Sequence, residues 1–322
     1  MADPRLNIVL LGSTGFVGSA VLRTALARGA SISTLVRSPA AKLSEGVRVI
    51  QGALPQIPKT LFTDAPFVVI HLASKQIDRD GTGYQENVSN AEALMRALPP
   101  QVRGIIFGSS MSVYGQGSQI DVSETTPLRP QTPLALARAA SEQVIAEGAA
   151  GRGIAAWRLR PRFVIGKCDQ HTVPGLLKLA RRRLCPGNGK QALAMVDVDD
   201  YAELILHLAQ ALANNDSPQG GALNISYARA PTLAELLAAA QELLGMAPGW
   251  RHLPLWEPLL AALRHLPPTR DLAIKLELIG LNHTSQPGRL AEVAPPGWLD
   301  RDALEVFRQA VRPLLQTEGK ME

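Results

Sequence analysis

Apolar, β-branched stretches alternate with longer segments of helical periodicity through the first half of the chain. Runs rich in Val, Ile and Leu predict strands, and apolar residues that recur every three to four positions predict helices. The predicted strands are residues 7–11, 31–36, 47–50, 67–72, 104–107 and 154–159. The predicted helices are residues 16–27, 84–98 and 134–149. Strands that alternate with helices indicate an α/β fold, a doubly wound parallel sheet with helices on both faces.

The second half of the chain is less regular. After Gly166 the alternation weakens, and the part beyond Pro231 is mostly helical with interrupting prolines. Residues 222–226 nevertheless predict one late strand of the same sheet. We therefore expect a core domain and a smaller C-terminal lobe. Their expected bounds are residues 1–165, with residues 195–230 returning to the core, and residues 166–322 for the lobe.

The composition is that of a globular protein. With 322 residues, of which 46% are hydrophobic, the chain is long enough to bury a sizeable core. Its apolar runs are far shorter than the ~20 residues of a spanning helix, and its N-terminal segment lacks the pattern of a signal peptide. We expect a cytoplasmic protein in which the two cysteines, Cys168 and Cys185, are reduced.

The charge is positive but dispersed. The 33 basic and 28 acidic residues give a net charge of +5 and are spread along the chain, which favours anionic small ligands over nucleic acid. The cationic run at residues 181–183 either contacts a substrate phosphate or is a solvated helix end, and we favour the second. No spacing typical of zinc ligands occurs, so no metal is expected.

A glycine-rich turn follows the first predicted strand and opens the first predicted helix. In Gly12-Ser13-Thr14-Gly15-Phe16-Val17-Gly18, the first glycine permits a tight turn, the second lets the backbone approach a pyrophosphate, and the third allows close helix packing. Free N–H groups at the helix start would receive the negative charge. This context predicts a Rossmann-type dinucleotide site.

The end of the second predicted strand indicates which dinucleotide binds. An NAD-binding unit carries Asp or Glu there, which hydrogen-bonds the ribose 2′-hydroxyl. This chain has Arg37 followed by Ser38, with Lys42 one turn later. A guanidinium and a hydroxyl suit a 2′-phosphate, so we predict NADP(H) as the cofactor. An ordinary exposed arginine at a strand end is the other interpretation.

Several motifs occur in the order that is typical of one protein family. They are the glycine turn, residues 69–73 (VIHLA), Asn87, residues 108–115 (GSSMSVYG), residues 160–161 (RP) and residues 196–200 (VDVDD). Over about residues 6–245 the chain resembles the extended short-chain dehydrogenase/reductase family. Within that family it looks most like the NAD(P)-dependent epimerase/dehydratase and 3β-hydroxysteroid dehydrogenase branch.

The resemblance implies roles for individual residues. It implies that Ser110 is the family's catalytic serine and that Asn87 braces the central sheet. It also implies a homodimer formed through the helices at residues 87–98 and 133–147. The positions that it places near the cofactor are Leu72, Ala73, Ser74, Arg138 and Pro161.

The chain departs from the family at its catalytic pair. The family uses Tyr-x-x-x-Lys on the helix after the fifth strand, where a spacing of four places phenol and ammonium on one helical face. Here the corresponding residues are Leu134 and Arg138, and none of the four tyrosines is followed by lysine four positions later. Ala53 also stands where the family commonly has an adenine-contacting Asp.

These departures leave three functional hypotheses. The first is an NADP(H)-dependent oxidoreductase that transfers hydride to or from a small organic substrate and uses an unusual proton donor. The candidate donors are Ser110, Tyr114, which is more often structural, and Lys75, which is more often a solvated loop cation. The second is a catalytically degenerate NADP(H) sensor or scaffold. The third is a sugar-nucleotide epimerase or dehydratase.

The C-terminal lobe offers weaker signals. Asp169 and His171 could exchange protons with a substrate, although an ordinary loop pair is favoured. The amphipathic segment at residues 253–266, with Trp256, could form a lid or a membrane-surface helix. We favour packing of this segment against the main domain.

Overall fold

A seven-stranded parallel sheet forms the centre of the protein. The computed structural model describes residues 6–38, 43, 45–78, 81–216, 220–266 and 268–318, with side chains at 271, 317 and 318 left aside. Within these residues the strands have the spatial order β11-β7-β5-β4-β1-β2-β3. Their bounds are β1 Asn7–Leu11, β2 Ser31–Val36, β3 Val47–Gln51, β4 Phe67–His71, β5 Val102–Gly108, β7 Ala155–Pro161 and β11 Gly221–Ile225. The predicted fold class is therefore confirmed, including the late strand beside β7.

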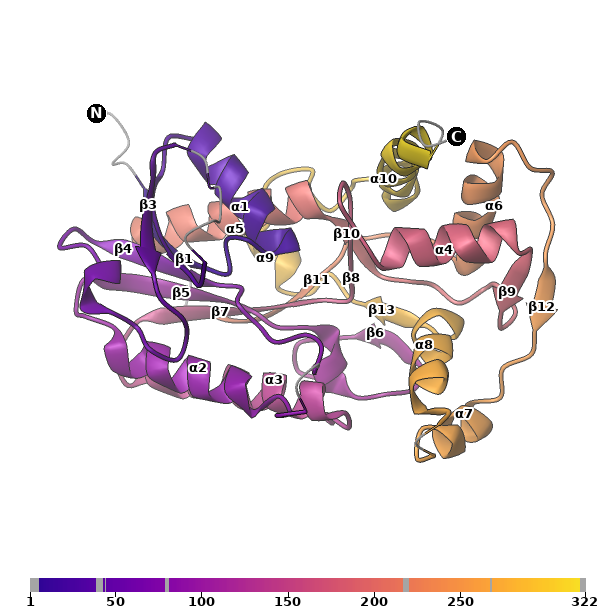
Figure 1. Cartoon of the computed structure of the whole chain (residues 1–322), viewed down its shortest axis with the longest axis horizontal. Helices are drawn as coiled ribbons and strands as arrows, with labels where there is room; N and C mark the ends of the chain where they lie inside the picture. Colours follow the sequence, from indigo (N-terminus) through magenta and orange to yellow (C-terminus); the bar gives the residue numbers. More distant parts are fainter. Residues whose placement is uncertain are drawn as a thin grey trace.

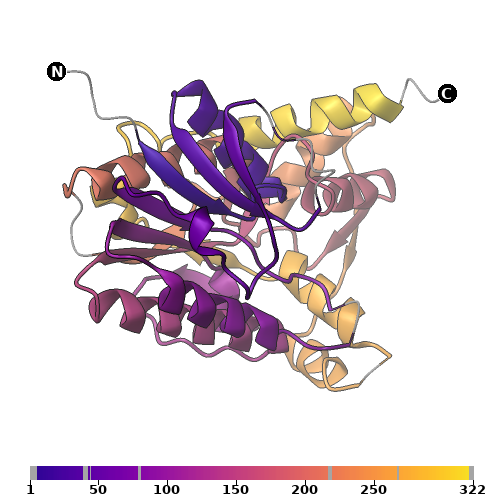
Figure 2. The same cartoon turned by 60° about the vertical axis from the view of Figure 1, so that its left-hand side comes forward.

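Helices cover both faces of the sheet (Figures 1 and 2). Helices α1 (Phe16–Ala27) and α5 (Val198–Ala213) pack together on one face, and α2 (Gln85–Ala97) and α3 (Pro133–Ala150) pack together on the other. Each pair closes a separate apolar core against the strands. Strand β4 is buried at all five positions, as expected of a parallel strand that is covered on both faces.

Local sequence explains the helix starts. Thr132 caps α3 by accepting a hydrogen bond from the Ala135 N–H, and Pro133 occupies the first turn, where no N–H is needed. Thr232 and Glu235 form a reciprocal capping box at the start of α6 (Leu233–Leu243). The predicted elements agree with the observed ones to within two residues at each end.

Small strand pairs and helices form the lobe on the other side of the molecule (Figure 1). The pairs are β8–β10, β9–β12 and β6–β13. The strands are β6 Gln119–Val122, β8 Phe163–Ile165, β9 Leu184–Pro186, β10 Met195–Asp197, β12 Arg251–Leu253 and β13 His283–Ser285. Its helices are α4 Thr172–Arg181, α6, α7 Glu257–Leu263, α8 Arg270–Gly280 and α10 Ala303–Glu318. Helix α9 Leu290–Val293 contacts β11 of the central sheet, and of the 3-10 turns η1 Lys59–Leu61 contacts β2 and η2 Met111–Tyr114 contacts α3.

The segment around Trp256 differs from our expectation. Helices α7 and α8 pack against each other, and Leu260 is buried. Trp256, however, is 66% exposed, and Leu259, Leu266 and Leu272 are also exposed. Packing of the whole segment against the main domain is therefore wrong for these side chains. The short helix α7 buries its apolar surface mainly through Leu260, which leaves its outer face in solvent.

Candidate functional site

The turn between β1 and α1, which we call the glycine cradle (residues 12–18), is built by two close backbone approaches. Gly12 has φ +92°, and a Cβ there would lie 2.6 Å from the Ala73 nitrogen in the chain after β4. A Cβ at Gly18 would lie 1.9 Å from the Gly12 carbonyl oxygen. Both positions therefore need glycine. At Gly12 the backbone of the turn touches the chain after β4, and at Gly18 the backbone of α1 touches the turn itself.

The second glycine of the cradle, Gly15, faces an open side. A Cβ at Gly15 would meet only the Gly12 oxygen, at 3.3 Å. Gly15 precedes α1, which has no side-chain cap and no acidic residue in its first turn. Its first N–H groups therefore remain available to a negative charge. These features fit a dinucleotide pyrophosphate.

The side chains of the cradle have different surroundings. The Ser13 hydroxyl is buried and lies 2.8 Å from the Thr34 hydroxyl of β2, so only the Ser13 backbone can contact a cofactor. Thr14 is exposed, and Phe16 and Val17 pack against the core beneath α1.

The adenosine end of the site lies where β2 ends. Strands β1 and β2 pair in parallel, with Leu11 opposite Leu35, so Arg37 leaves the sheet at the same edge as the cradle. Arg37 and Ser38 are exposed. Lys42 lies outside the described residues, and Ala53 follows β3 without a polar side chain.

The loop after β4 is held rigidly over this edge. The Asn87 amide of α2 accepts a hydrogen bond from the Lys75 N–H at 2.7 Å and donates one to the Lys75 carbonyl at 3.1 Å. Asn87 thus braces this loop rather than the sheet itself. The Lys75 ammonium lies 2.9 Å from an Asp78 carboxylate oxygen and 2.7 Å from the Thr82 hydroxyl. Its side chain is only 11% exposed, so the interpretation as a solvated cation is wrong. The ammonium already donates its hydrogens to Asp78 and Thr82.

Two serines and one arginine come together where β5 ends and α3 begins. Ser110 caps η2, and its hydroxyl accepts a hydrogen bond from the Ser112 N–H at 3.2 Å. The Ser112 hydroxyl in turn accepts one from Arg138 at 3.0 Å. Arg138 also donates to the side-chain oxygen of Gln76, in the loop after β4. Sequence reasoning missed both as site residues, because Ser112 lies within the motif at residues 108–115 without an implied role and Gln76 lies outside every motif.

Arg138 remains a cation in this setting. Burial lowers its pKa to about 10, and Tyr84, at the start of α2, is the group whose charge favours the protonated form. The guanidinium is therefore charged at neutral pH and bound to neutral oxygens. Leu134, one turn earlier on α3, is half-buried and apolar.

Tyr114 is placed in the interior rather than toward this site. Its hydroxyl donates to the Asn224 side-chain oxygen at 2.7 Å and accepts from Arg160, also at 2.7 Å. Arg160 forms a buried ion pair with Glu142 of α3. Burial raises the pKa of the Tyr114 phenol. These hydrogen bonds tie β7 and β11 to η2, which favours the structural role of Tyr114 over that of a proton donor.

A group of charged residues in the lobe, which we call the arginine cluster, consists of Arg162 and Arg264 with Glu277. Glu277 of α8 accepts a hydrogen bond from the Gly117 N–H and forms an ion pair with Arg264 at 2.6 Å. Arg162, between β7 and β8, contacts the His283 ring at 3.0 Å. The charges of Glu277 and Arg138 both act on Arg162.

Other candidates of the lobe have structural roles. The Asp169 carboxylate accepts hydrogen bonds from the backbone N–H groups of His171, Thr172 and Val173, and so caps α4. Pro161 is buried at the end of β7. Residues 181–183 end α4 with exposed side chains, and Arg183 donates to carbonyls at Ala247 and Gly249.

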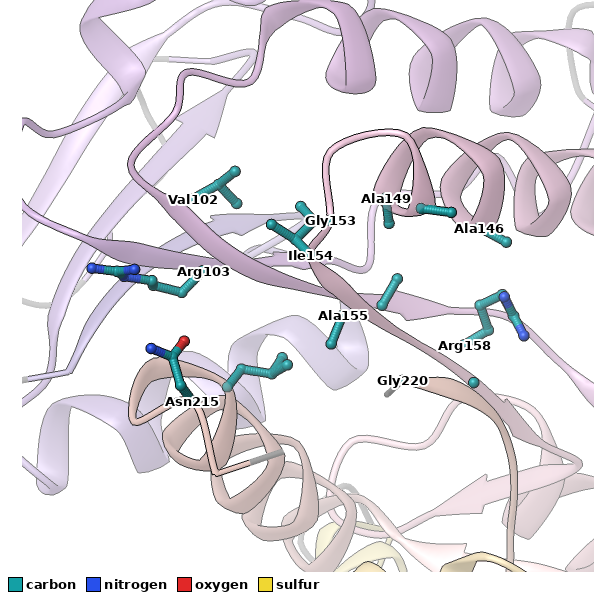
Figure 3. A pocket seen from close by; sticks show the side chains of 14 residues that line it. Val102, Arg103, Ala146, Ala149, Gly153, Ile154, Ala155, Arg158, Asn215 and Gly220 are labelled. Atoms are coloured by element: carbon teal, nitrogen blue, oxygen red, sulfur yellow. The ribbon is translucent and has the colours of Figure 1, made fainter. Parts of the chain in front are cut away.

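Two pockets lie away from the cradle. One, of about 740 Å³, opens at the amino ends of β5, β7 and β11, with Arg103 and Asn215 at one end and Arg158 at the other (Figure 3). Ligands of doubly wound sheets bind at the opposite, carboxyl edge, so this pocket is not the cofactor site. A second, of about 550 Å³, lies in the lobe and includes Lys190 and His252.

The described residues contain neither a metal centre nor a membrane-spanning helix. No group of three or more His, Cys, Asp or Glu side chains there is arranged to hold a metal ion. None of the helices in those same residues is long and apolar enough to cross a membrane.

Comparisons with known proteins agree with this geometry. The model of the NAD-dependent epimerase/dehydratase family matches residues 8–226, more than half of the chain. A UDP-glucose 4-epimerase of Lactobacillus helveticus is 23% identical over 279 residues, which cover 75% of this chain and 82% of the relative. A 4-hydroxy-2-methyl-3-oxo-4-farnesyl-3,4-dihydroquinoline-1-oxide ketoreductase of Stigmatella aurantiaca is 28% identical over 189 residues, which cover 55% and 56% of the two chains.

Solved structures of similar fold include two epimerases. The UDP-N-acetylglucosamine 4-epimerase of Methanobrevibacter ruminantium, in complex with UDP-N-acetylmuramic acid, has a TM-score of 0.73 at 17% identity and covers 97% of this chain and 99% of its own. The Thermus thermophilus UDP-glucose 4-epimerase, in complex with NAD, has a TM-score of 0.69 at 23% identity and covers 95% and 98%. These likenesses establish the fold.

Proposed function

Because the chain belongs to the NAD-dependent epimerase/dehydratase family, we propose that it is a cytoplasmic enzyme that binds a nicotinamide dinucleotide, NADP(H) in preference to NAD(H). We propose further that it catalyses hydride transfer at a carbon–oxygen centre of a sugar-nucleotide substrate. One observation carries this proposal. The glycine cradle and the Ser110–Ser112–Arg138 group stand at the same carboxyl edge of one sheet, where a bound dinucleotide would extend from one to the other.

The residues of the chain would divide the work as follows. The cradle backbone holds the pyrophosphate, and Arg37 with Ser38 holds the 2′-phosphate. When bound, the nicotinamide ring supplies or accepts the hydride. Ser110 hydrogen-bonds the reacting oxygen, and the Arg138 cation stabilises negative charge that develops on that oxygen.

Tyr84 is our candidate for the proton donor. It stands at the start of α2, is half-buried, and lies within electrostatic reach of Arg138. A phenol beside a cation is the combination that the family usually builds on one helix, and here it would be built from α2 and α3. In the reducing direction Tyr84 gives its proton to the substrate oxygen as the carbon receives the hydride, and oxidation reverses both transfers.

A sensor without turnover is the second candidate function. The observation that favours it is the apolar Leu134 at the family's tyrosine position. Such a protein would bind NADP(H) through the cradle but leave substrate unchanged. The two functions differ in turnover and not in cofactor binding.

One experiment separates the two. The full chain is incubated with NADP(H) or NAD(H) and with UDP-glucose, UDP-galactose or a panel of ketones, and products are followed by NMR. The enzyme hypothesis expects product, and Arg138→Gln should lower kcat about 100-fold while cofactor affinity is kept. Tight cofactor binding without product on any substrate would instead support the sensor.

A further inference from the structure

The cavity of about 740 Å³ at the amino edge of the sheet has the size and the lining of a small-molecule site. Ligand pockets usually measure roughly 300–1,000 Å³ and combine apolar walls with a few polar groups. Here one wall consists of alanines near the end of α3 with Val102 and Ile154 beside them, and the small alanine side chains leave the space open (Figure 3). The polar side chains are those of Arg103, Arg158 and Asn215. The proposed function uses none of these residues.

The charged side chains that line this cavity are both positive. Arg103 lies at one end and Arg158 at the other (Figure 3), and among the described residues no Asp or Glu lines the space between them. Arg103 is exposed to solvent. The Arg158 side chain, in contrast, is only 21% exposed. Arg158 is therefore the cation whose partners decide what the cavity can hold.

The carboxylate with which Arg158 forms an ion pair is already occupied. Glu142 accepts hydrogen bonds from the Arg160 Nε atom at 2.9 and 3.2 Å and a further one from an Arg160 Nη atom. The Arg158 Nε atom lies 4.0 Å from the same carboxylate, which is beyond hydrogen-bond distance. Within the part of the chain that the structure describes, Arg158 donates no side-chain hydrogen bond.

This setting favours an anion beside Arg158. A guanidinium carries five N–H donors and no acceptor. Burial lowers the pKa of Arg158; the charge of Glu142 raises it, and the charges of Arg160 and Arg289 lower it further. Because the Arg158 side chain lines the cavity, an anionic group there would supply both a hydrogen-bond acceptor and a second negative charge.

The wall opposite α3 is fixed by Arg289. The backbone of Gly220 and Gly221 lines the cavity, and an Arg289 Nη atom donates to the Gly220 carbonyl at 2.9 Å. A Cβ at Gly221 would lie 1.9 Å from the Arg289 guanidinium, which also lies 5.2 Å from the centre of the Trp157 ring. A Cβ at Gly220 would lie 2.3 Å from the Ala156 carbonyl oxygen of β7. These close contacts make the wall a preformed part of the fold.

We propose that this cavity is a second ligand site, which takes a small organic anion whose apolar or aromatic body carries a carboxylate or a phosphate. The anionic group pairs with the planar fork of Arg158 donors, which matches carboxylate and phosphate geometry. The apolar body lies on the alanines of α3, and Arg103 attracts the ligand from the open end.

This site is separate from the proposed reaction. The cavity opens at the amino ends of β5, β7 and β11, whereas the glycine cradle lies at the carboxyl edge of the same sheet. The ligand of the cavity is therefore neither the dinucleotide nor the molecule that exchanges a hydride with it. The proposal does not depend on whether the protein has turnover.

The test measures probe binding to the full chain by calorimetry, at constant ionic strength set with chloride. Phenyl phosphate and benzoate distinguish a phosphate site from a carboxylate site, and benzyl alcohol is the uncharged analogue. The wild-type protein should bind phenyl phosphate or benzoate with a dissociation constant in the millimolar range or tighter. Benzyl alcohol should bind at least about tenfold more weakly. Each titration is repeated with saturating NADPH, which should not displace the probe.

Variants locate the probe in the cavity. Arg158→Gln should weaken anion binding at least about tenfold, while Glu142 keeps its hydrogen bonds to Arg160. If Arg158→Gln does not fold, Arg158→Lys takes its place; lysine keeps the charge but loses the fork, and binding should weaken several-fold. Ala150→Phe, at an exposed position of the lining, fills part of the space and should also weaken binding. Arg251→Gln, at an exposed arginine of β12 outside the lining, is the matched control and should leave the affinity unchanged.

Several results would overturn the proposal. The first is that neither phenyl phosphate nor benzoate binds to the wild-type protein, and the second is that benzyl alcohol binds as tightly as they do. Wild-type affinity in the Arg158 variant that folds, or in Ala150→Phe, would show that the probe binds elsewhere. Displacement of the probe by NADPH would place it in the glycine cradle and not in the cavity.

Discussion

The glycine cradle and the arginine cluster border the same edge of one sheet, yet the cradle is built from backbone contacts and the cluster from side-chain contacts. The cradle consists of seven consecutive residues whose close contacts are backbone to backbone, as between Gly18 and the Gly12 carbonyl. The cluster consists of side chains from the β7–β8 connection, from α8 and from the residue that follows α7, held by charge and hydrogen bonds. The cradle has almost no room for an added side-chain atom. In the cluster, a side chain can be exchanged for another residue type, and the exchange alters the chemistry of the site. This contrast would let a chain keep a glycine cradle while the side chains around its reacting centre change.

The largest expected effect tests the rigidity of the cradle. Gly18→Ala places a methyl group 1.9 Å from the Gly12 oxygen, so the turn must shift. We expect NADPH affinity to fall at least about 100-fold and the free energy of unfolding to fall by about 3 kcal/mol or more. Fluorescence titration and chemical denaturation measure the two. Gly175→Ala, in α4 with no neighbour within 4 Å of the added carbon, is the control and should stabilise slightly. Equal NADPH affinities in the two variants would contradict the backbone account.

The next largest effect tests whether Tyr84, at the start of α2, supplies the proton that the family takes from a tyrosine on another helix. Tyr84→Phe removes only the hydroxyl, and we expect kcat to fall about 10²–10⁴-fold with NADPH affinity unchanged. The measurement is kcat beside the NADPH dissociation constant. Arg138→Lys should lose much less of kcat, since it keeps the cation beside Tyr84. A Tyr84→Phe enzyme with the wild-type kcat would exclude Tyr84 as donor.

A smaller effect distinguishes a structural role of Tyr114 from a catalytic one. Tyr114→Phe leaves Arg160 and Asn224 each without one hydrogen-bond partner in the interior. We expect the free energy of unfolding to fall by about 1–3 kcal/mol, measured by urea denaturation, and kcat to stay close to the wild-type value. A loss of kcat as large as that of Tyr84→Phe, with stability unchanged, would show that Tyr114 takes part in proton transfer.

The same contrast explains what the sequence could predict. The strands, the first helix and the cradle follow from local patterns, because each depends on residues within a few positions of one another. Arg162 and His283 are 121 positions apart, and no spacing rule connects them. Gln76 and Ser112 reach Arg138 from two different loops. The exposure of Trp256 was also missed, because amphipathic periodicity indicates an apolar face without indicating what covers it.

The smallest effect concerns the one place where the cradle depends on a side-chain charge. Arg37 is exposed at the end of β2, so a change there alters cofactor choice without disturbing the turn. We expect wild-type protein to bind NADPH at least about tenfold more tightly than NADH, and Arg37→Glu to reverse this order, because a carboxylate repels the 2′-phosphate and accepts a hydrogen bond from the ribose 2′-hydroxyl. Dissociation constants for both cofactors, measured at two salt concentrations, check this, and the NADPH preference of the wild type should shrink at high salt as the exposed charge is screened. Equal constants for the two cofactors in the wild-type protein would mean that Arg37 is an ordinary surface arginine. The cradle would then select a pyrophosphate alone, and the identity of the dinucleotide would be set elsewhere in the site.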